Sequence, residues 1–305
     1  MGVLKNWEVA ALLFRVAELL ALKEDNEYKL QIGDNIKIFL KDDEFEELTK
    51  IQKPDKIEND IKKLDKKNIV YEDGDLLIIN KNPWINVHPW DFKTKETNLI
   101  YQVRDYLWNK LNSLTFKPSL VHRIDRDTSW IVIIAKKKSI LTKLALDFKT
   151  NKNIKKTYYA IVFWKMPNSF WVIDDKLLRI ENALKENKVQ IFQDWKKAIT
   201  NYKVLKTHKI KIPTWNLDIQ ELEIKIETWK MHQIRVHLAN IGCPIILDNK
   251  YWNKSLNWYI FKKTWFNRQA LHAWKIEFIH YEKNKKISLE ANFKDDMKDF
   301  LKNIT

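Results

Sequence analysis

The sequence predicts a protein that combines β-strands with α-helices in one main domain at residues 68–305. Short apolar runs bounded by polar residues, which are typical of buried strands, recur along this part of the chain. Between these runs, two stretches have apolar residues at helical spacing instead. The preceding residues 41–67 are dense in charge and poor in apolar residues, which indicates a linker after a small N-terminal segment.

The N-terminal segment, residues 1–40, carries two different patterns. Its first half has apolar residues at helical spacing, although strands are also compatible with it: Val9, Leu13, Val16 and Leu20. Residues 28–38 alternate between polar and apolar around a Gly-Asp pair, which predicts two short strands. We therefore expect a small α/β module before the linker.

The main domain contains four predicted strands, at residues 76–79, 131–135, 158–162 and 222–226. The first three are continuous apolar runs, as expected of strands that are buried on both faces, and the fourth alternates. Residues 140–148 predict a helix between the second and third strands. The stretch from about Met231 to Asn240 predicts another helix.

The tryptophan and glycine contents are both abnormal. The chain has 14 Trp and 4 Gly, whereas an average composition would give roughly 21 Gly. Several Trp stand beside polar residues in slots that are typical of turns, where glycine supplies a positive φ. Either the protein is rich in Trp, or UGA codons that some bacteria read as glycine have been translated as tryptophan. We favour the second explanation, although Trp108, within an apolar stretch, fits a genuine tryptophan.

Charge and cysteine content narrow the function classes. The net charge of +15 and the pI of about 9.5 favour a polyanionic partner, most simply nucleic acid, although a lysine-rich solvated surface is the alternative. The single Cys243 excludes an internal disulfide framework and fits a reducing compartment. The chain has no apolar run of membrane-spanning length and its N-terminus no cleavable signal pattern, so we expect a cytoplasmic protein.

Candidate catalytic residues gather directly before the second predicted strand. In residues 121–130, Asp125 lies between Arg123 and Arg126, which should keep it ionised and available as a nucleophile or base. Taken alone, the loop would more simply be a turn with surface ion pairs. A kinase catalytic loop is excluded, because it requires a contiguous His-Arg-Asp and a glycine-rich phosphate loop.

Two other segments carry candidate site residues. Tyr158 follows the basic pair Lys155-Lys156, so it could stack on a base beside phosphate contacts, or equally belong to the core. Arg235, in the run from 228 to 238, could point inward and hold a carboxylate with two hydrogen bonds, or be an exposed cation.

The sequence favours no metal site. His232 and His237 are five residues apart, which separates them by about 140° around a helix, so they do not share a face as metal ligands would. The chain has one cysteine and no carboxylate pair near these histidines. A metal-dependent nuclease is therefore rejected as a function.

Together, the segments resemble the RNA pseudouridine synthases of the large-ribosomal-subunit type over most of residues 68–280. The matching motifs are Asn80–Pro83 with VHP at 87–89, HRIDRDTS at 122–129, KKTYYAIV at 155–162, Thr228 with HQIRVH at 232–237, and RQALHA at 268–273. Lys230 stands where the family usually has Arg, and Asn82 is an additional residue. The family has glycine at seven positions that hold Trp here: Trp84, Trp90, Trp130, Trp164, Trp195, Trp229 and Trp252.

This resemblance implies an α+β fold with a twisted, mostly antiparallel sheet and flanking helices. It also implies the isomerisation of uridine to pseudouridine in structured RNA, without a cofactor, on a base that is flipped out of the RNA. Asp125 would attack the ribose or the base, Tyr158 would stack on the base, and Arg235 would pair with Asp125. The RNA contacts would come from Arg123, which enters the space left by the base, and from four more cationic or imidazole side chains: His122, Arg126, Lys156 and His232.

Residues 1–40 are similar to the later part of an S4 RNA-binding module, on the strength of KNWEV at 5–9 and LQIGDNIKI at 30–38. We expect a monomer that acts on ribosomal RNA, most simply 23S RNA. The alternative is a non-catalytic RNA-binding or ribosome-assembly factor on the same scaffold. If the Trp are genuine, indoles at Trp130 and Trp229 are expected to crowd the site, and any that need a positive φ would add strain of roughly 1 kcal/mol each.

Overall fold

The computed structural model describes residues 63–88, 98–107, 116–122, 124–181, 187–191, 196–212, 216–252 and 254–304. The chain divides into two compact units, residues 1–61 with 107–117, and residues 62–106 with 118–305. The sheet and the candidate site belong to the second unit, which starts a few residues before the predicted boundary at 68. The S4-like module and nearly all of the predicted linker lie outside the described residues.

The second unit contains both helices and strands. The helices are η1 (Lys66–Asn68), α3 (Leu99–Leu107), α4 (Lys138–Thr150), α5 (Gln233–Asn240), α6 (Lys254–Thr264) and α7 (Asp295–Ile304). The strands are β1 (Ile69–Glu72), β2 (Leu76–Lys81), β3 (Ser119–Leu120), β4 (Ser129–Ala135), β5 (Ile154–Phe163), β6 (Phe170–Glu181), β7 (Asn187–Ile191), β8 (Lys196–Lys211), β9 (Asn216–Ile226), β10 (Leu271–His280) and β11 (Lys285–Glu290).

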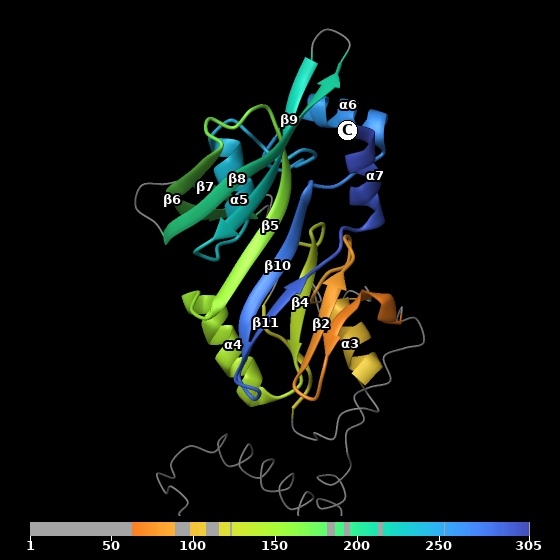
Figure 1. Ribbon diagram of the computed structural model, residues 1–305, viewed down its shortest axis with the longest axis vertical. Coiled ribbons are helices and arrows are strands. Elements are labelled where there is room, and N and C mark those ends of the chain that lie inside the picture. Colours follow the sequence, from red (N-terminus) through yellow and green to blue (C-terminus); the bar gives the residue numbers. More distant parts are fainter. Residues whose placement is uncertain are drawn as a thin grey trace, which may run out of the picture. The chain divides into compact units, whose positions relative to one another are not determined.

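All of these strands form one sheet with the order β1-β2-β4-β10-β5-β9-β8-β6-β7, while β3 adds to β4 and β11 adds to β10 (Figure 1). Every pairing is antiparallel except that of β4 with β10, where Ser129 and Trp130 lie beside His272 and Ala273. The α+β fold with a mostly antiparallel sheet is therefore confirmed.

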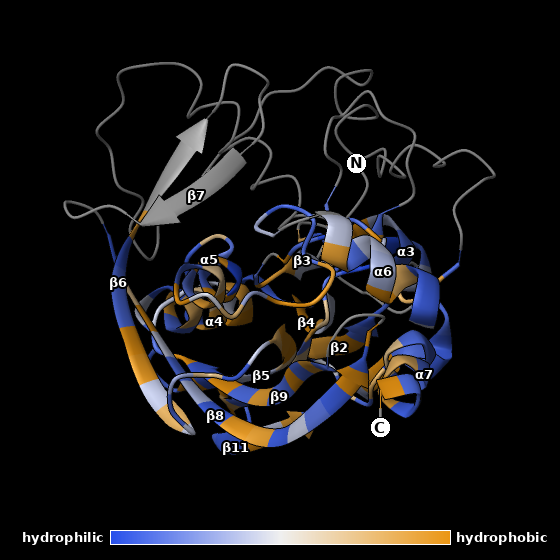
Figure 2. Ribbon diagram, turned by 90° about the horizontal axis from the view of Figure 1, so that it is seen from above, coloured by the Kyte–Doolittle hydropathy of each residue, from blue (hydrophilic) through white to orange (hydrophobic). Residues whose placement is uncertain are grey.

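The core lies between the sheet and the helices on its inner side. Viewed along the sheet in Figure 2, the strands follow a curve, and α4 and α5 lie within it. All seven residues of β4 are buried, because β2 and β10 flank it and helices cover it. This explains why its sequence is a continuous apolar run rather than an alternating one. β9 alternates because every second side chain leaves the core.

The predicted strands and helices in the main domain are confirmed as β2, β4, β5, β9, α4 and α5. The predicted helix from about Met231 begins two residues later, at Gln233, because His232 precedes it in the left-handed region with a φ of 53°. The hairpins of β6, β7 and β8 were not predicted. Lysines and polar residues dominate β8, half of which is exposed, and they occupy buried as well as exposed positions, so the strand lacks the apolar alternation by which strands are identified.

Within the described residues, no helix has the length and apolar character that crossing a membrane requires.

Candidate active site

The loop that carries Asp125 is fixed by contacts from three other parts of the chain. Its backbone closes a turn through the N–H of Thr128, which donates to the Asp125 carbonyl (3.3 Å). Gln269 Nε2 donates to Thr128 Oγ1 (2.7 Å), and Ser129 Oγ is hydrogen-bonded to His272 Nδ1 (2.8 Å). The RQALHA motif thus serves the site by holding the base of this loop.

Lys81 also holds the loop that carries Asp125 in place. It is 1% exposed, and its Nζ donates to the carbonyls of Asn82 (2.9 Å), Ile85 (3.0 Å) and Arg126 (2.9 Å). One ammonium thereby joins the turn after β2 to the residue that follows Asp125. This role of Lys81 is not predicted from the sequence. The available signal was a lysine at the end of a strand that is otherwise apolar or uncharged.

The Asp125 carboxylate meets Arg235 from α5. Arg235 Nη1 donates to Asp125 Oδ2 (2.9 Å), so the predicted pair forms across 110 residues of sequence. The Asp125 side chain remains 32% exposed, which leaves it open to a reactant. The ion pair holds the carboxylate in one orientation while it stays accessible.

The two-point carboxylate contact predicted for Arg235 also forms, but with a different residue. Arg235 Nε and Nη2 donate to Asp248 Oδ2 (2.7 Å) and Oδ1 (2.8 Å). Asp248 is buried and also accepts from the backbone N–H of Lys250 (3.0 Å). Burial opposes the charge of Arg235, but the hydrogen bonds and charge of Asp248 more than offset this and raise the Arg235 pKa above its ordinary value. Asp248 is not among the residues predicted from the sequence for this site.

The start of α5 is tied to the sheet by Gln233. Its Nε2 donates to the Ile199 carbonyl (2.9 Å), and its Oε1 accepts from Thr228 Oγ1 (2.8 Å) and from the N–H of Lys230 (3.1 Å). These bonds fix the first turn of the helix, where Arg235 lies. The glutamine of the HQIRVH motif is thus a structural residue.

His232 lies on the other side of Asp125. Its Nε2 is 3.8 Å from Asp125 Oδ1, and its Nδ1 is hydrogen-bonded to the Tyr251 hydroxyl (2.6 Å). Burial lowers the pKa of His232 to about 4, although the charge of Asp125 acts in the opposite direction. The ring is therefore neutral at pH 7. When Nδ1 accepts the Tyr251 proton, Nε2 carries the hydrogen that faces Asp125.

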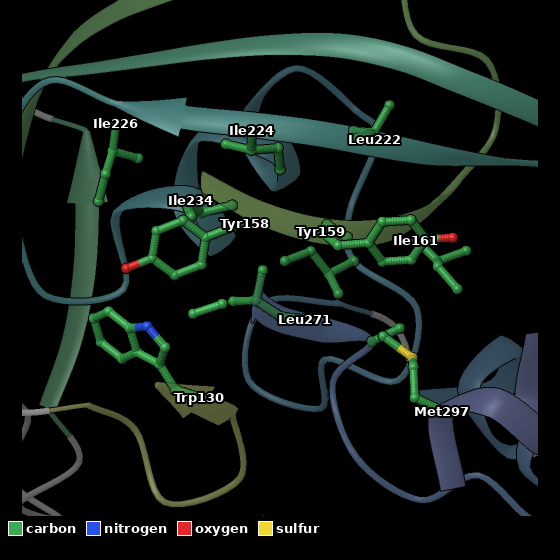
Figure 3. Close-up of a cluster of buried hydrophobic side chains, with 14 of the residues drawn as sticks. Trp130, Tyr158, Tyr159, Ile161, Leu222, Ile224, Ile226, Ile234, Leu271 and Met297 are labelled. Carbon is green, nitrogen blue, oxygen red and sulfur yellow. The ribbon is translucent and has the colours of Figure 1, made fainter. Parts of the chain in front are cut away.

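Tyr158 lies on β5 beside this group and is 5% exposed. Burial and the nearby Asp125 charge raise its pKa well above the ordinary value, so the phenol keeps its proton. Its ring does not face solvent. Figure 3 shows the indole of Trp130 next to it, and their ring centroids are 5.5 Å apart with the planes tilted by 49°.

The structure separates the residues predicted to contact RNA. Arg126 is exposed at the site, where it pairs with Asp127 (2.9 Å), and His232 lines it. His122 and Lys156 are buried instead, both next to Trp229. Arg123 lies outside the described residues.

His122 is part of the packed interior in this structure. Its ring stacks on Phe148 at 4.2 Å, and its Nε2 accepts from the N–H of Ile133 (3.1 Å). Lys156 holds its ammonium over the ring of Trp229 (4.8 Å) and against the side-chain oxygen of Asn151. With these neighbours in place, neither side chain can reach RNA.

Metal-ligand side chains come together in the described part of the chain at Asp73, Asp75 and His280. Each has protein partners, among them Lys283 on Asp73 (2.6 Å) and Lys137 on Asp75 (2.5 Å). The group lies by the start of β2, whereas Trp130 and the Asp125 loop lie by its end. The cluster is therefore an ion-pair network, and it takes no part in the candidate site.

Buried neutral histidines make the stability of this unit depend on pH. Burial lowers the pKa of His122 to about 3, and those of His237 and His272 to about 4, from an ordinary 6.5. Below pH 6.5 these histidines bind protons in the unfolded chain but stay neutral in the folded chain. The free energy of unfolding therefore decreases as the pH falls. We expect each histidine to cost about 1.4 kcal/mol of unfolding free energy per pH unit between roughly pH 6 and 4.

Urea unfolding at a series of pH values measures this slope, and His237→Phe is the matched variant. His237 is fully buried and neither ring nitrogen has a hydrogen-bond partner among the described residues, so its replacement strands no partner there. Because the variant lacks one of these histidines, its unfolding free energy should change less steeply with pH, by the contribution of one protonation. An unchanged slope would contradict the assignment of His237 as a buried neutral group.

Comparison with known proteins gives one consistent result. The model of the RNA pseudouridylate synthase family matches residues 75–240. Ribosomal large subunit pseudouridine synthase C of Buchnera aphidicola (subsp. Schizaphis graminum) is 34% identical over 278 residues, 90% of this chain and 81% of that protein. Synthase D of the same organism is 33% identical over 77% of this chain and 72% of that protein.

A solved structure, human RNA Pseudouridylate Synthase Domain Containing 4, has the same fold with a TM-score of 0.61 and 22% identity. The match covers 78% of this chain and 93% of that chain.

Proposed function

Because the chain belongs to the RNA pseudouridylate synthase family, we propose that it isomerises uridine to pseudouridine in structured RNA of the large ribosomal subunit, most simply 23S RNA. The observation that carries this proposal is the Asp125 carboxylate. It is partly exposed, held by Arg235, and electrostatically coupled to Tyr158. The single Cys243 and an RNA substrate fit the cytoplasm as the compartment.

The reaction moves the ribose from N1 to C5 of the uracil base. The N1–C1′ bond breaks and the C5–C1′ bond forms, while C5 loses its proton and N1 gains one, so that the product is an isomer of the substrate. Asp125 is the proposed nucleophile, towards the ribose or the base, and an ionised carboxylate can act without a general base. No redox change or group donor is needed, so the reaction needs no cofactor.

Arg235 and Asp248 are proposed to keep this nucleophile aligned. Arg235 is held at two points by Asp248, so its remaining Nη1 has little freedom when it meets Asp125. Asp248 is a positioning residue in this scheme, because it acts on Asp125 only through Arg235. His232 would contact RNA beside Asp125, and Arg126 would contact phosphate from the exposed side of the loop.

Release of tritium from RNA labelled at C5 of uridine tests the proposal directly. The enzyme should release one tritium for each pseudouridine formed. If the protein purified from its native organism binds large-subunit RNA and releases no tritium, it would instead be the non-catalytic RNA-binding or assembly factor that the same scaffold could support.

RNA affinity should fall steeply with salt. The net charge is +15, and each phosphate neutralised by Lys or Arg releases counterions. If about four phosphates are contacted, we expect affinity to fall on the order of 100-fold between roughly 50 and 200 mM salt. Filter binding over this range measures the slope, and an affinity independent of salt would contradict the electrostatic account.

The proposed S4-like module can be tested in the same measurement. Removing residues 1–40 should weaken binding and flatten the salt slope, while chemistry persists at high RNA concentration, because Asp125, Tyr158 and Arg235 all belong to the other unit. Complete loss of tritium release would contradict an accessory role for this segment.

A further inference from the structure

Tryptophan occupies left-handed backbone positions in this fold to an unusual extent. Nine Trp lie in the described part of the chain, and three of them have a positive φ: Trp84 (67°), Trp164 (63°) and Trp265 (59°). Only a few per cent of non-glycine residues adopt this region, with Asn, Asp and His favoured. Three of the other positive-φ residues here are indeed Asn. Trp has no short polar side chain to compensate for the strain.

Two of these positions belong to turns that require glycine. Trp84 follows Pro83, and a proline followed by a φ near 67° is the signature of a type II turn, whose third residue is usually Gly. Trp265 directly follows α6, and its N–H donates to the Phe261 carbonyl (2.7 Å). This is the C′ position, where glycine ends many helices. Its indole is 73% exposed, so burial does not compensate for the strain there.

The third position, Trp164, ends β5. Its N–H donates to the Asp218 carbonyl of β9 (2.7 Å), so the strand pairing fixes its backbone. Its indole packs edge-on against Trp252 (4.9 Å), whose buried Nε1 has no hydrogen-bond partner among the described residues. A buried indole N–H without a partner is costly, so Trp252 also fits its site poorly.

Trp130 and Trp229 are conspicuous for another reason. Neither has a positive φ, so the expected backbone strain does not arise. The expected crowding of the site does arise. Their indoles stack at 4.9 Å with an angle of 16° between planes, and Trp130 faces Tyr158 (Figure 3). The two indoles therefore occupy space beside the tyrosine ring, where a base that stacks on it would have to lie.

The groups around the two indoles are those of a binding slot. Tyr158 and His122 lie 5.5 and 4.6 Å from Trp130, and Phe148 lies 5.4 Å from Trp229. Lys156 holds its ammonium over the face of Trp229, and no carboxylate is paired with it among the described residues. With glycine in place of both indoles, aromatic walls and one buried cation would surround a space of planar shape.

We propose that the functional protein carries glycine, not tryptophan, at positions 84, 130, 164, 229, 252 and 265. The stacked indoles of Trp130 and Trp229 then mark the slot that receives the flipped pyrimidine base. Lys156 donates a hydrogen bond to one of its carbonyl oxygens there. The slot rests on the proposed function, whereas the identity of the residues does not. Trp90 and Trp195 lie outside the described residues.

The gene gives the first test. UGA codons at the six positions, with glycine in peptides of the native protein by mass spectrometry, are expected. UGG codons at positions 84, 164 and 265 would overturn the assignment, whatever the enzyme's activity.

Thermal unfolding of the full chain gives a second, independent test. Replacing Trp84, Trp164 and Trp265 together by glycine should raise the melting temperature, because glycine relieves the strain. Trp258→Gly is the matched control. Trp258 is an exposed residue within α6 without a positive φ, so glycine there should lower the melting temperature. A triple variant that is less stable than the original chain would contradict the backbone argument.

Activity tests the slot. In the chain with the three turn glycines, Trp130→Gly with Trp229→Gly should turn tritium release on, and the chain that keeps both indoles should be inactive. Equal activity with and without the two indoles would rule out the proposed base-binding slot. A stable six-glycine chain encoded by UGA that binds RNA but releases no tritium would instead overturn the proposed function, and leave the residue assignment standing.

Lys156→Met in the six-glycine chain tests the cation. We expect at least about a tenfold loss of turnover at saturating RNA, the equivalent of one charged hydrogen bond, with partial recovery in Lys156→Arg. Unchanged turnover would remove Lys156 from the proposal.

Discussion

Asp125→Asn is expected to abolish turnover, by about four orders of magnitude or more, because it replaces a nucleophilic carboxylate by an amide of the same shape. The amide oxygen can still accept from Arg235 Nη1, so the loop and the fold should be unchanged. RNA affinity should stay within a few-fold, since no phosphate contact is lost. The variant belongs in the six-glycine chain, with tritium release and filter binding as the two measurements.

Asp127→Asn is its matched control. Asp127 lies in the same loop, two residues further on, and its carboxylate pairs on the exposed side with Arg126 (2.9 Å). Its loss should change turnover by no more than a few-fold, since exposed pairs contribute little. Near-normal activity in Asp125→Asn would rule out Asp125 as the nucleophile, and an equal loss in both variants would show that the loop, rather than one carboxylate, had been damaged.

Arg235→Met is expected to cost about 3–5 kcal/mol of unfolding free energy, the range for breaking a buried pair on one side only. The cause is Asp248, whose side chain is 1% exposed and would be left with its charge and no cation. Replacing Asp248 by Asn as well should recover part of this loss, because the uncompensated charge disappears. Urea unfolding monitored at a fixed pH near 7 measures both.

Arg268→Met supplies the comparison. Arg268 is as deeply buried as Arg235, and it holds Asp296 at two points, at 2.6 and 3.0 Å. The Asp296 side chain is 35% exposed and can turn to water. We therefore expect a smaller loss, about 1–2 kcal/mol. Equal losses in the two arginine variants would show that packing of the arginine, rather than the stranded Asp248, sets the cost.

The catalytic group was largely predictable from sequence because its residues stand in short motifs. Asp125 lies between two arginines, Tyr158 follows a basic pair, and Arg235 lies in a helix whose spacing is clear. The structure brings all three together. The roles of Asp125, Tyr158 and Arg235 in the reaction stay predictions until the variants are measured.

The residues that surround this group and hold it in place were not predictable in the same way. Asp248 lies 13 residues after Arg235 and meets it only because the chain reverses after α5. Lys81 is fully buried, whereas a lysine in a sequence ordinarily indicates a solvent-exposed position. His122 was expected to contact RNA, but its position behind Trp130 and Trp229 depends on packing that no local pattern reveals. Long-range pairings of this kind are set by the tertiary fold.

The order of the strands also determines when during synthesis this protein can become active. Asp125 precedes β4, whereas Tyr158 lies on β5 in the other half of the sheet and Arg235 lies on α5, and β10 is the strand that joins the two halves. A growing chain that ends before Leu271 contains all three residues but leaves one edge of β5, and the Ser129–Trp130 end of β4, without a partner strand, and such edges are prone to aggregate. The late arrival of β10 thus closes the site and covers both edges in one step. A chain that terminated before Leu271 would therefore contain every proposed catalytic residue and yet be inactive.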